Sequence, residues 1–109
     1  GSNLGPLSRG LTEQVRRRIA AYRAENGLAA DRAVPADAVT ASASGLDPHI
    51  SVPNALIQAR RVARSRGMDE AGLLAMIAAH TEARSLGVVG EPRVNVLMLN
   101  LALDQKERP

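Results

Sequence analysis

The stretch Arg93-Val-Asn-Val-Leu-Met-Leu99 decides the fold class, because it is rich in residues that favour β-structure. It follows Pro92 and is apolar on both faces of an extended chain, as in a strand buried within a sheet. The sequence therefore predicts a long C-terminal strand. Asn95 and Asn100 interrupt it on opposite faces and need hydrogen-bond partners if they are buried. Residues 101–104 fit a continued strand or a helix equally well.

Three helices are predicted upstream of this strand. Residues 10–26 carry apolar residues at helical spacing, which are Leu11, Val15, Ile19 and Tyr22. Asn26-Gly27 is a helix stop, since glycine accepts the left-handed backbone of a C-terminal cap.

The second and third predicted helices cover residues 52–66 and 70–82. Ser51 and Asp69 are suitable N-caps, and Gly67 ends the second helix. The residues expected to be buried are Leu56, Ala59, Val62, Ala63, Leu73, Leu74, Met76 and Ile77.

Residues 38–40 form a short strand candidate. The predicted fold is therefore α+β, with about three helices packed on a small sheet and a long C-terminal strand. Two strands alone are marginally stable, so the sheet needs further pairing that the sequence does not locate.

The composition fits one small domain with a limited core. The chain has 109 residues, of which 19 are alanine, and Tyr22 is the only aromatic residue. Without cysteine, disulfides, cysteine-bound zinc and thiol catalysis are excluded. No apolar run approaches the roughly 20 residues that span a bilayer.

Arginine dominates the charge, with a formal net value of +3. The arginines cluster at 16–23 and 60–66, and such clusters can meet nucleic acid, anionic lipid or acidic protein. A solvated arginine face is the favoured interpretation. A basic helical DNA-binding module is the alternative, since residues 53–82 have the length of a helix-turn-helix. The second of those helices, however, carries no arginine or lysine to read a major groove.

The 40–51 segment is the most informative part of the chain. Its small hydroxyl residues, Gly45 and Asp47-Pro48 make regular structure unfavourable. These residues would let the backbone approach a phosphate, a carbonyl or a partner chain closely. They would equally suit a tight crossover between two elements, and the residues alone leave both interpretations open.

No catalytic or metal constellation emerges from the sequence. Ser42 or Ser44 with Asp47 and His49 would place a whole triad within one loop, and there is no G-x-S-x-G elbow. Asp47-x-His49 and His80-x-Glu82 supply two potential metal ligands each, so neither pair predicts a metal site. No P-loop motif is present.

Val39-Thr-Ala-Ser-Ala-Ser-Gly-Leu-Asp-Pro-His-Ile-Ser51 resembles the signature loop of the KdpC subunit family of the bacterial high-affinity potassium-transporting ATPase. Further matching motifs fall in the same order and together span nearly the whole chain: Gly1-Ser-Asn-Leu-Gly-Pro6, Gln58 with Arg61-Val-Ala63, Gly90-Glu-Pro-Arg-Val-Asn-Val-Leu97 and Leu99-Asn-Leu-Ala-Leu-Asp104.

The resemblance implies that residues 1–109 are the soluble C-terminal domain of a single-pass membrane protein whose N-terminal membrane helix is absent from this chain. It implies a non-catalytic accessory subunit that assembles with a potassium-conducting subunit and a P-type ATPase subunit. The family is described as a chaperone that raises the ATP affinity of the pump subunit. ATP and potassium are then handled by the partners, and this chain needs no cofactor, metal or nucleic acid.

The resemblance also nominates site residues. The family's loop and downstream glutamine are likened to the ABC-transporter signature, which makes Ser44, Gly45 and Gln58 candidate nucleotide contacts. The implied location of the domain is the extracytoplasmic face of the membrane, where cytoplasmic ATP does not reach, so a docking role is preferred. The candidate partner-binding residues are Thr40, Ser42, Ser44, Gly45, Leu46, Asp47, His49, Gln58 and Arg61.

The family's preceding portion carries most of its aromatic residues. We therefore expect residues 1–109 to leave apolar surface uncovered and one sheet edge unpaired, and to self-associate.

Overall fold

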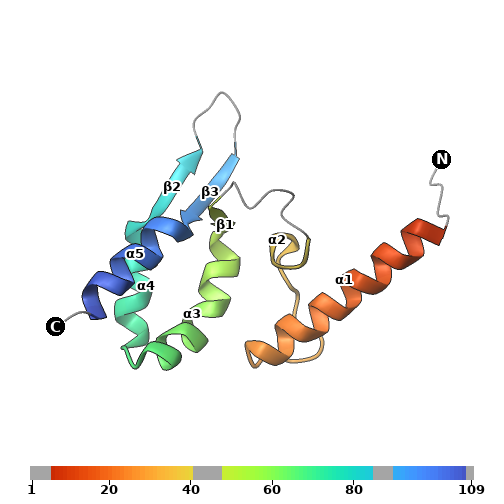
Figure 1. Cartoon of the computed structure of the whole chain (residues 1–109), viewed down its shortest axis with the longest axis horizontal. Coiled ribbons are helices and arrows are strands. Elements are labelled where there is room, and N and C mark those ends of the chain that lie inside the picture. Colours follow the sequence, from red (N-terminus) through yellow and green to blue (C-terminus); the bar gives the residue numbers. More distant parts are fainter. Residues whose placement is uncertain (1–5, 41–47, 85–89, 108–109) are drawn as a thin grey trace.

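The computed structural model describes residues 6–40, 48–84 and 90–107. Within these ranges the chain forms five helices and one three-stranded antiparallel sheet (Figure 1), which confirms the α+β class. The elements in chain order are α1 (Pro6–Glu25), α2 (Ala36–Val39), β1 (His49–Ser51), α3 (Val52–Arg66), α4 (Glu70–Ala79), β2 (Thr81–Arg84), β3 (Gly90–Asn95) and α5 (Val96–Glu107).

The sheet has the strand order β1-β3-β2, with β3 in the centre. Ile50 lies opposite Val94, and Val94 lies opposite Thr81, so these three residues share one face. The other face carries His49, Glu82 and Asn95, among others. β1 and β2 each pair on one side only among the described strands, so the sheet has two open edges.

The expected long C-terminal strand is wrong, because the strand ends at Asn95 and α5 begins at the next residue. The side-chain oxygen of Asn95 accepts a hydrogen bond from the backbone N–H of Met98 at 3.0 Å. This is the geometry of a helix N-cap, and it satisfies one of the unpaired N–H groups of the first turn. Asn95 is thus a helix start, not an interruption in a strand.

Two smaller expectations also differ from the structure. Residues 36–39 form a helical turn, α2, where residues 38–40 were expected to be a strand. β2 supplies the pairing that the sequence did not locate, and its register with β3 shifts between Glu82 and Arg84. Pro92 lies at this irregularity, where a missing N–H costs least.

The helices α3 and α4 confirm the predicted caps. Ser51 and Asp69 accept hydrogen bonds from backbone N–H groups in the first turns of α3 and α4. Gly67 ends α3 with φ +63° in the left-handed region. α4 ends at Ala79, three residues before its predicted end.

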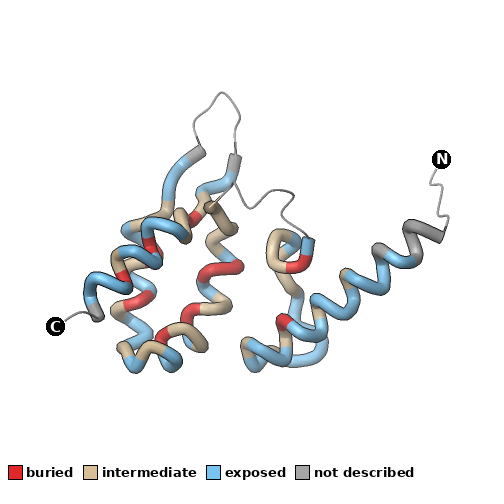
Figure 2. Tube along the Cα trace, in the orientation of Figure 1, coloured by how far each residue is buried: buried red, intermediate tan, exposed pale blue. Residues whose placement is uncertain are grey.

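The core lies between α3, α4, α5 and the sheet. Its buried residues are Ala55, Ala59, Ala63, Leu73, Ile77, Val94, Leu99 and Leu103. Tyr22 and Val39 are also buried, but these two residues of the segment 6–40, which we call the N-terminal arm, do not belong to this cluster. Figure 2 shows burial concentrated in α3, α4 and α5, whereas α1 is largely exposed and extends away from the other elements.

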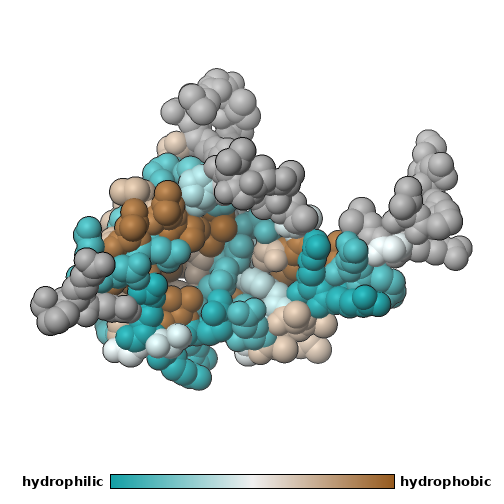
Figure 3. Space-filling view, in the orientation of Figure 1, coloured by the Kyte–Doolittle hydropathy of each residue, from teal (hydrophilic) through white to brown (hydrophobic). Residues whose placement is uncertain are grey.

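Several large apolar side chains lie outside this core. Leu56 and Leu74 were expected to be buried but are 48% and 38% exposed. On α5, Leu97, Met98 and Leu101 are 57%, 49% and 48% exposed, and Figure 3 shows apolar surface over this helix. None of the described helices is long and apolar enough to cross a bilayer.

Candidate functional site

The structure describes four of the predicted partner-binding residues: Thr40, His49, Gln58 and Arg61. The remaining five, Ser42, Ser44, Gly45, Leu46 and Asp47, lie outside the described residues. The site is therefore built from the two ends of the 40–51 segment and from the face of α3 behind them.

Asp37 connects the two ends of the 40–51 segment. Its carboxylate accepts hydrogen bonds from the backbone N–H of Ser51 at 2.9 Å and from the Ser51 hydroxyl at 2.6 Å. Thr40 donates its hydroxyl to the carbonyl of Ala36 at 3.0 Å, and Val96 N–H donates to the carbonyl of Pro48 at 2.8 Å. Hydrogen bonds thus fix the base of the segment on both sides.

Asn54 joins this base to α1. Its side chain, 3% exposed, donates to the Asp37 carboxylate at 3.0 Å. Its side-chain oxygen accepts the hydroxyl of Tyr22 at 2.8 Å and the amide of Gln58 at 2.7 Å. The amide of Asn54 therefore uses donors and acceptors at once, and it brings α1, α2 and α3 together.

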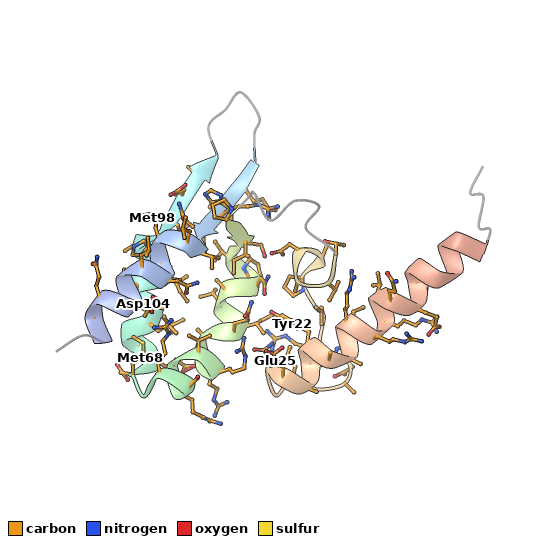
Figure 4. All side chains as sticks on the ribbon, in the orientation of Figure 1. Tyr22, Glu25, Met68, Met98 and Asp104 are labelled. Carbon is orange, nitrogen blue, oxygen red and sulfur yellow. The ribbon has the colours of Figure 1, made fainter. Side chains whose placement is uncertain are left out.

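Gln58 and Arg61 extend the hydrogen-bonded chain along α3. Arg61 donates to the side-chain oxygen of Gln58 at 2.8 Å and to that of Asn26 at 3.0 Å, and it lies 3.6 Å from the carboxylate of Glu25. Figure 4 shows Tyr22 and Glu25 near the end of α1 that lies beside α3. We call Tyr22, Asp37, Ser51, Asn54, Gln58 and Arg61 the polar network.

The polar network connects the N-terminal arm to α3 and β1 through side-chain hydrogen bonds. The apolar core cluster includes no residue of the arm. Each hydrogen bond contributes only about 1 kcal/mol net to the stability of the fold. It does, however, fix the distance and angle between the groups that it joins. The position of the arm, and with it the base of the 40–51 segment, therefore depends on side-chain geometry.

The network changes the acidity of two groups. Burial disfavours the Asp37 carboxylate, but the hydrogen bonds from Ser51 and Asn54 outweigh burial and hold the pKa of Asp37 below its ordinary value. Burial, with the nearby Asp37 charge, raises the pKa of the Tyr22 hydroxyl above its ordinary value. At neutral pH Asp37 is therefore an anion and Tyr22 a neutral donor.

His49 does not belong to the polar network that contains Gln58 and Arg61. Its Nε2 is 2.9 Å from Oε1 of Glu82, whose other oxygen accepts from the amide of Asn95 at 3.0 Å. These residues connect β1, β3 and β2 across the polar face of the sheet. The structure thus brings two of the predicted site residues, Gln58 and Arg61, into contact and places His49 in a separate cluster.

Sequence reasoning missed Tyr22, Asp37 and Asn54 as members of the site, and it predicted Ser51 only as a helix cap. A signal for Asn54 was present, because Asn54, Gln58 and Arg61 follow one another at i, i+4 and i+7 on one helix face. Asp37 had no such signal, since its partners Ser51 and Asn54 are 14 and 17 residues away.

A cleft of about 550 Å³ opens beside the base of the 40–51 segment. Val34 and Pro35 of the arm and Pro53 and Ile57 of α3 form apolar parts of its wall. Residues 6–40, 48–84 and 90–107 hold no group of three or more histidine or acidic residues arranged to bind a metal ion. The described geometry is that of a recess with charged and apolar walls.

The chain matches a known protein family and is similar in sequence to several curated proteins. The family model described as KdpC, K+-transporting ATPase, c chain, matches residues 1–105. The chain is 57% identical over 103 residues to the potassium-transporting ATPase KdpC subunit of Cereibacter sphaeroides, covering 94% of this chain and 54% of the relative. The corresponding subunit of Sorangium cellulosum is 58% identical over 104 residues, covering 95% of this chain and 54% of the relative.

The KdpC subunit of Mycobacterium tuberculosis is also similar, with 56% identity over 105 residues that cover 96% of this chain and 56% of the relative. The chain spans about half the length of the curated relatives it matches.

Proposed function

The chain belongs to the KdpC family of potassium-transporting ATPase subunits, and we propose that it serves as a non-catalytic accessory part of an ATP-driven potassium uptake complex. It acts in assembly and as a catalytic chaperone for the ATP-hydrolysing subunit. Its partners are that subunit and the potassium-conducting subunit, which handle ATP and potassium themselves.

The observation that carries this proposal is the hydrogen-bonded base of the 40–51 segment. Asp37 connects residues on both sides of the segment, and Asn54 connects Asp37 to α1 and α3. A segment whose ends are fixed loses less conformational entropy when it binds a partner, and this favours docking.

The cleft beside this base supports the same function. Its apolar wall can accept a side chain of a partner subunit, and burial of apolar surface contributes roughly 25 cal/mol per Å². If a partner contacts both the segment and the cleft, the strength of its binding depends on the position of the N-terminal arm. The chaperone effect then follows if the partner's ATP-binding conformation makes better contacts with this surface than its other conformations do.

The hydrogen bonds of Gln58 favour a docking role over direct contact with a nucleotide. Both ends of its side-chain amide are engaged, one with Asn54 and the other with Arg61. A nucleotide that recruited Gln58 would have to compete with these bonds. We therefore assign Gln58 and Arg61 to holding the docking surface in place.

The membrane attachment and the side of the membrane also belong to the proposal. The complex is membrane-bound, and this chain corresponds to the soluble C-terminal domain of a single-pass subunit on the extracytoplasmic face. The DNA-binding alternative is not favoured, since the family match points to a transport complex and α4 presents no arginine or lysine.

The test is co-purification of the full-length subunit with the potassium-conducting and ATPase subunits. The loop variant is Asp47→Asn with Ser44→Ala, which changes two of the predicted partner-binding residues of the 40–51 segment. We expect the loop variant to recover less of both partners and to slow growth at limiting potassium, with an unchanged unfolding transition of residues 1–109.

The control is Asp31→Asn, which removes a carboxylate charge from an exposed position outside the 40–51 segment. It should recover both partners at the native yield. Native co-purification and native growth of the loop variant would show that the 40–51 segment is not the docking element.

A further inference from the structure

A second cleft lies between the end of α1 and the C-terminal half of α3, with a volume of about 570 Å³. Three arginines of α3 line it, together with residues of the α1 end. The polar lining residues are Arg60, Arg61, Arg64, Ser65, Glu25 and Asn26. Figure 4 shows Glu25 at the α1 side of this region.

Of the three guanidinium groups, only that of Arg61 has an ion-pair partner among the described residues. Arg61 lies 3.6 Å from the carboxylate of Glu25 and donates to Asn26 and Gln58. The exposed side chains of Arg60 and Arg64 have no ion-pair partner in the described parts of the chain. The cleft therefore carries two uncompensated positive charges.

The placement of these charges is unfavourable for the helix alone. Arg60 and Arg64 are four residues apart, so their side chains are neighbours on one face and repel each other. The C-terminal dipole of α3 favours Arg64, which lies in the last turn, but Arg60 lies one turn earlier. A bound anion would remove this repulsion.

We propose that this cleft binds a phosphate group. Two free guanidinium groups match the charge of a phosphate dianion, and each presents a planar fork of N–H donors that pairs with two phosphate oxygens. The Ser65 hydroxyl adds a further donor at the same wall. A single carboxylate would balance only one of the two charges, as Glu25 already does for Arg61.

The phosphate group can come from free phosphate or from the headgroup of an anionic phospholipid. Two titrations of residues 1–109 at low salt separate these sources. One uses inorganic phosphate, followed by calorimetry. The other uses vesicles of phosphatidylcholine with and without phosphatidic acid, followed by co-sedimentation.

The test variant is Arg60→Gln with Arg64→Gln, and the matched control is Arg16→Gln with Arg17→Gln, which removes the same charge from exposed positions of α1. We expect the test variant to bind at least about 10-fold more weakly in whichever titration shows binding. The control should change affinity by less than about 2-fold. The near-ultraviolet circular dichroism of Tyr22, the only aromatic residue, verifies that both variants fold.

Binding in the phosphate titration alone identifies a soluble ligand, and binding to phosphatidic acid vesicles alone identifies a lipid headgroup. Absence of binding in both titrations would overturn the proposal. Equal weakening in the test and control variants would also overturn it, because it would show attraction to net charge without a site.

Discussion

Asn54 is one of the residues that join the N-terminal arm to α3, and its side chain has three partners. It donates to Asp37 and accepts from Tyr22 and Gln58, all within 3.0 Å. Because the side chain is 3% exposed, water cannot replace these partners if the amide is removed. The three hydrogen bonds of this one side chain therefore help to fix the position of the arm.

Asn54→Ala should lower the free energy of unfolding by about 2 to 3 kcal/mol, because it leaves buried hydrogen-bonding groups without partners. Denaturant unfolding measures this change. Asn100→Ala, which truncates the same side chain at an exposed position of α5, should change it by less than about 0.5 kcal/mol. Equal effects at the two positions would show that the network does not stabilise the fold.

The charge of Asp37 makes the network sensitive to acid. Its pKa is lower in the folded chain than its ordinary value of 3.8, so the carboxylate contributes stability above that pH. This contribution is lost as the pH falls through the folded-state pKa.

The unfolding free energies of the native chain and of Asp37→Asn should therefore differ most near neutral pH. The difference should shrink below about pH 4, as the native carboxyl becomes protonated. Urea unfolding at a series of pH values measures it. A difference that stays constant, or that grows on acidification, would show that the Asp37 charge is not stabilised by its hydrogen bonds.

At the scale of the elements, the end of α3 depends on one glycine. Gly67 has φ +63°, which costs a residue with a Cβ about 1 to 2 kcal/mol. Gly67→Ala should lower the unfolding free energy by that amount, although no atom would contact the added Cβ within 4 Å.

Gly72→Ala is the matched control for backbone strain. Gly72 lies in α4 with an ordinary φ and open space around it, so alanine should stabilise the chain by up to about 1 kcal/mol. Thermal unfolding distinguishes the two variants by the sign of the change in midpoint. Stabilisation by both would contradict the assigned left-handed cap.

Some helices carry local sequence signals that make them predictable, and others do not. The helices α3 and α4 could be predicted because a side-chain cap at the start and a glycine after α3 mark their ends locally. The first turn of α5 resembles a strand in sequence, since Val, Leu and Met fill both faces of residues 94–99. The helical spacing of the buried Leu99 and Leu103 is clear only once Asn95 is understood as a cap.

The rest of the fold depends on distant contacts. β2 has little strand character of its own and is defined by its pairing with β3. The partners of Asp37 are likewise distant in sequence, so the site could be predicted only in part, through Gln58 and Arg61. Ser42, Ser44, Gly45, Leu46 and Asp47 were nominated by resemblance and lie outside the described residues, so their role remains a prediction.

At the scale of the whole molecule, α5 presents an apolar stripe. Leu97, Met98 and Leu101 are each about half exposed, and Leu101 follows Leu97 by four residues and Met98 by three, so it is a neighbour of both on the helix surface. Exposed apolar surface of this kind favours association between copies. Sedimentation velocity over a range of concentrations should therefore show self-association of residues 1–109.

Leu97→Gln with Leu101→Gln should shift this equilibrium toward the monomer. Leu56→Gln is the control, because Leu56 and Leu101 are both 48% exposed but lie on different helices. A native chain that stays monomeric at every concentration would contradict the expected self-association through the exposed apolar surface of α5.

The central claim is that the 40–51 segment, fixed at its base by Asp37, meets a partner subunit. Photo-crosslinking in the assembled complex tests this most directly, with p-benzoylphenylalanine replacing either the exposed Thr40 or, as a control, the exposed Asp31. The account predicts a crosslink from position 40 to the potassium-conducting or ATPase subunit and little or none from position 31. A complex that assembles fully and yields no partner crosslink from position 40 would contradict it.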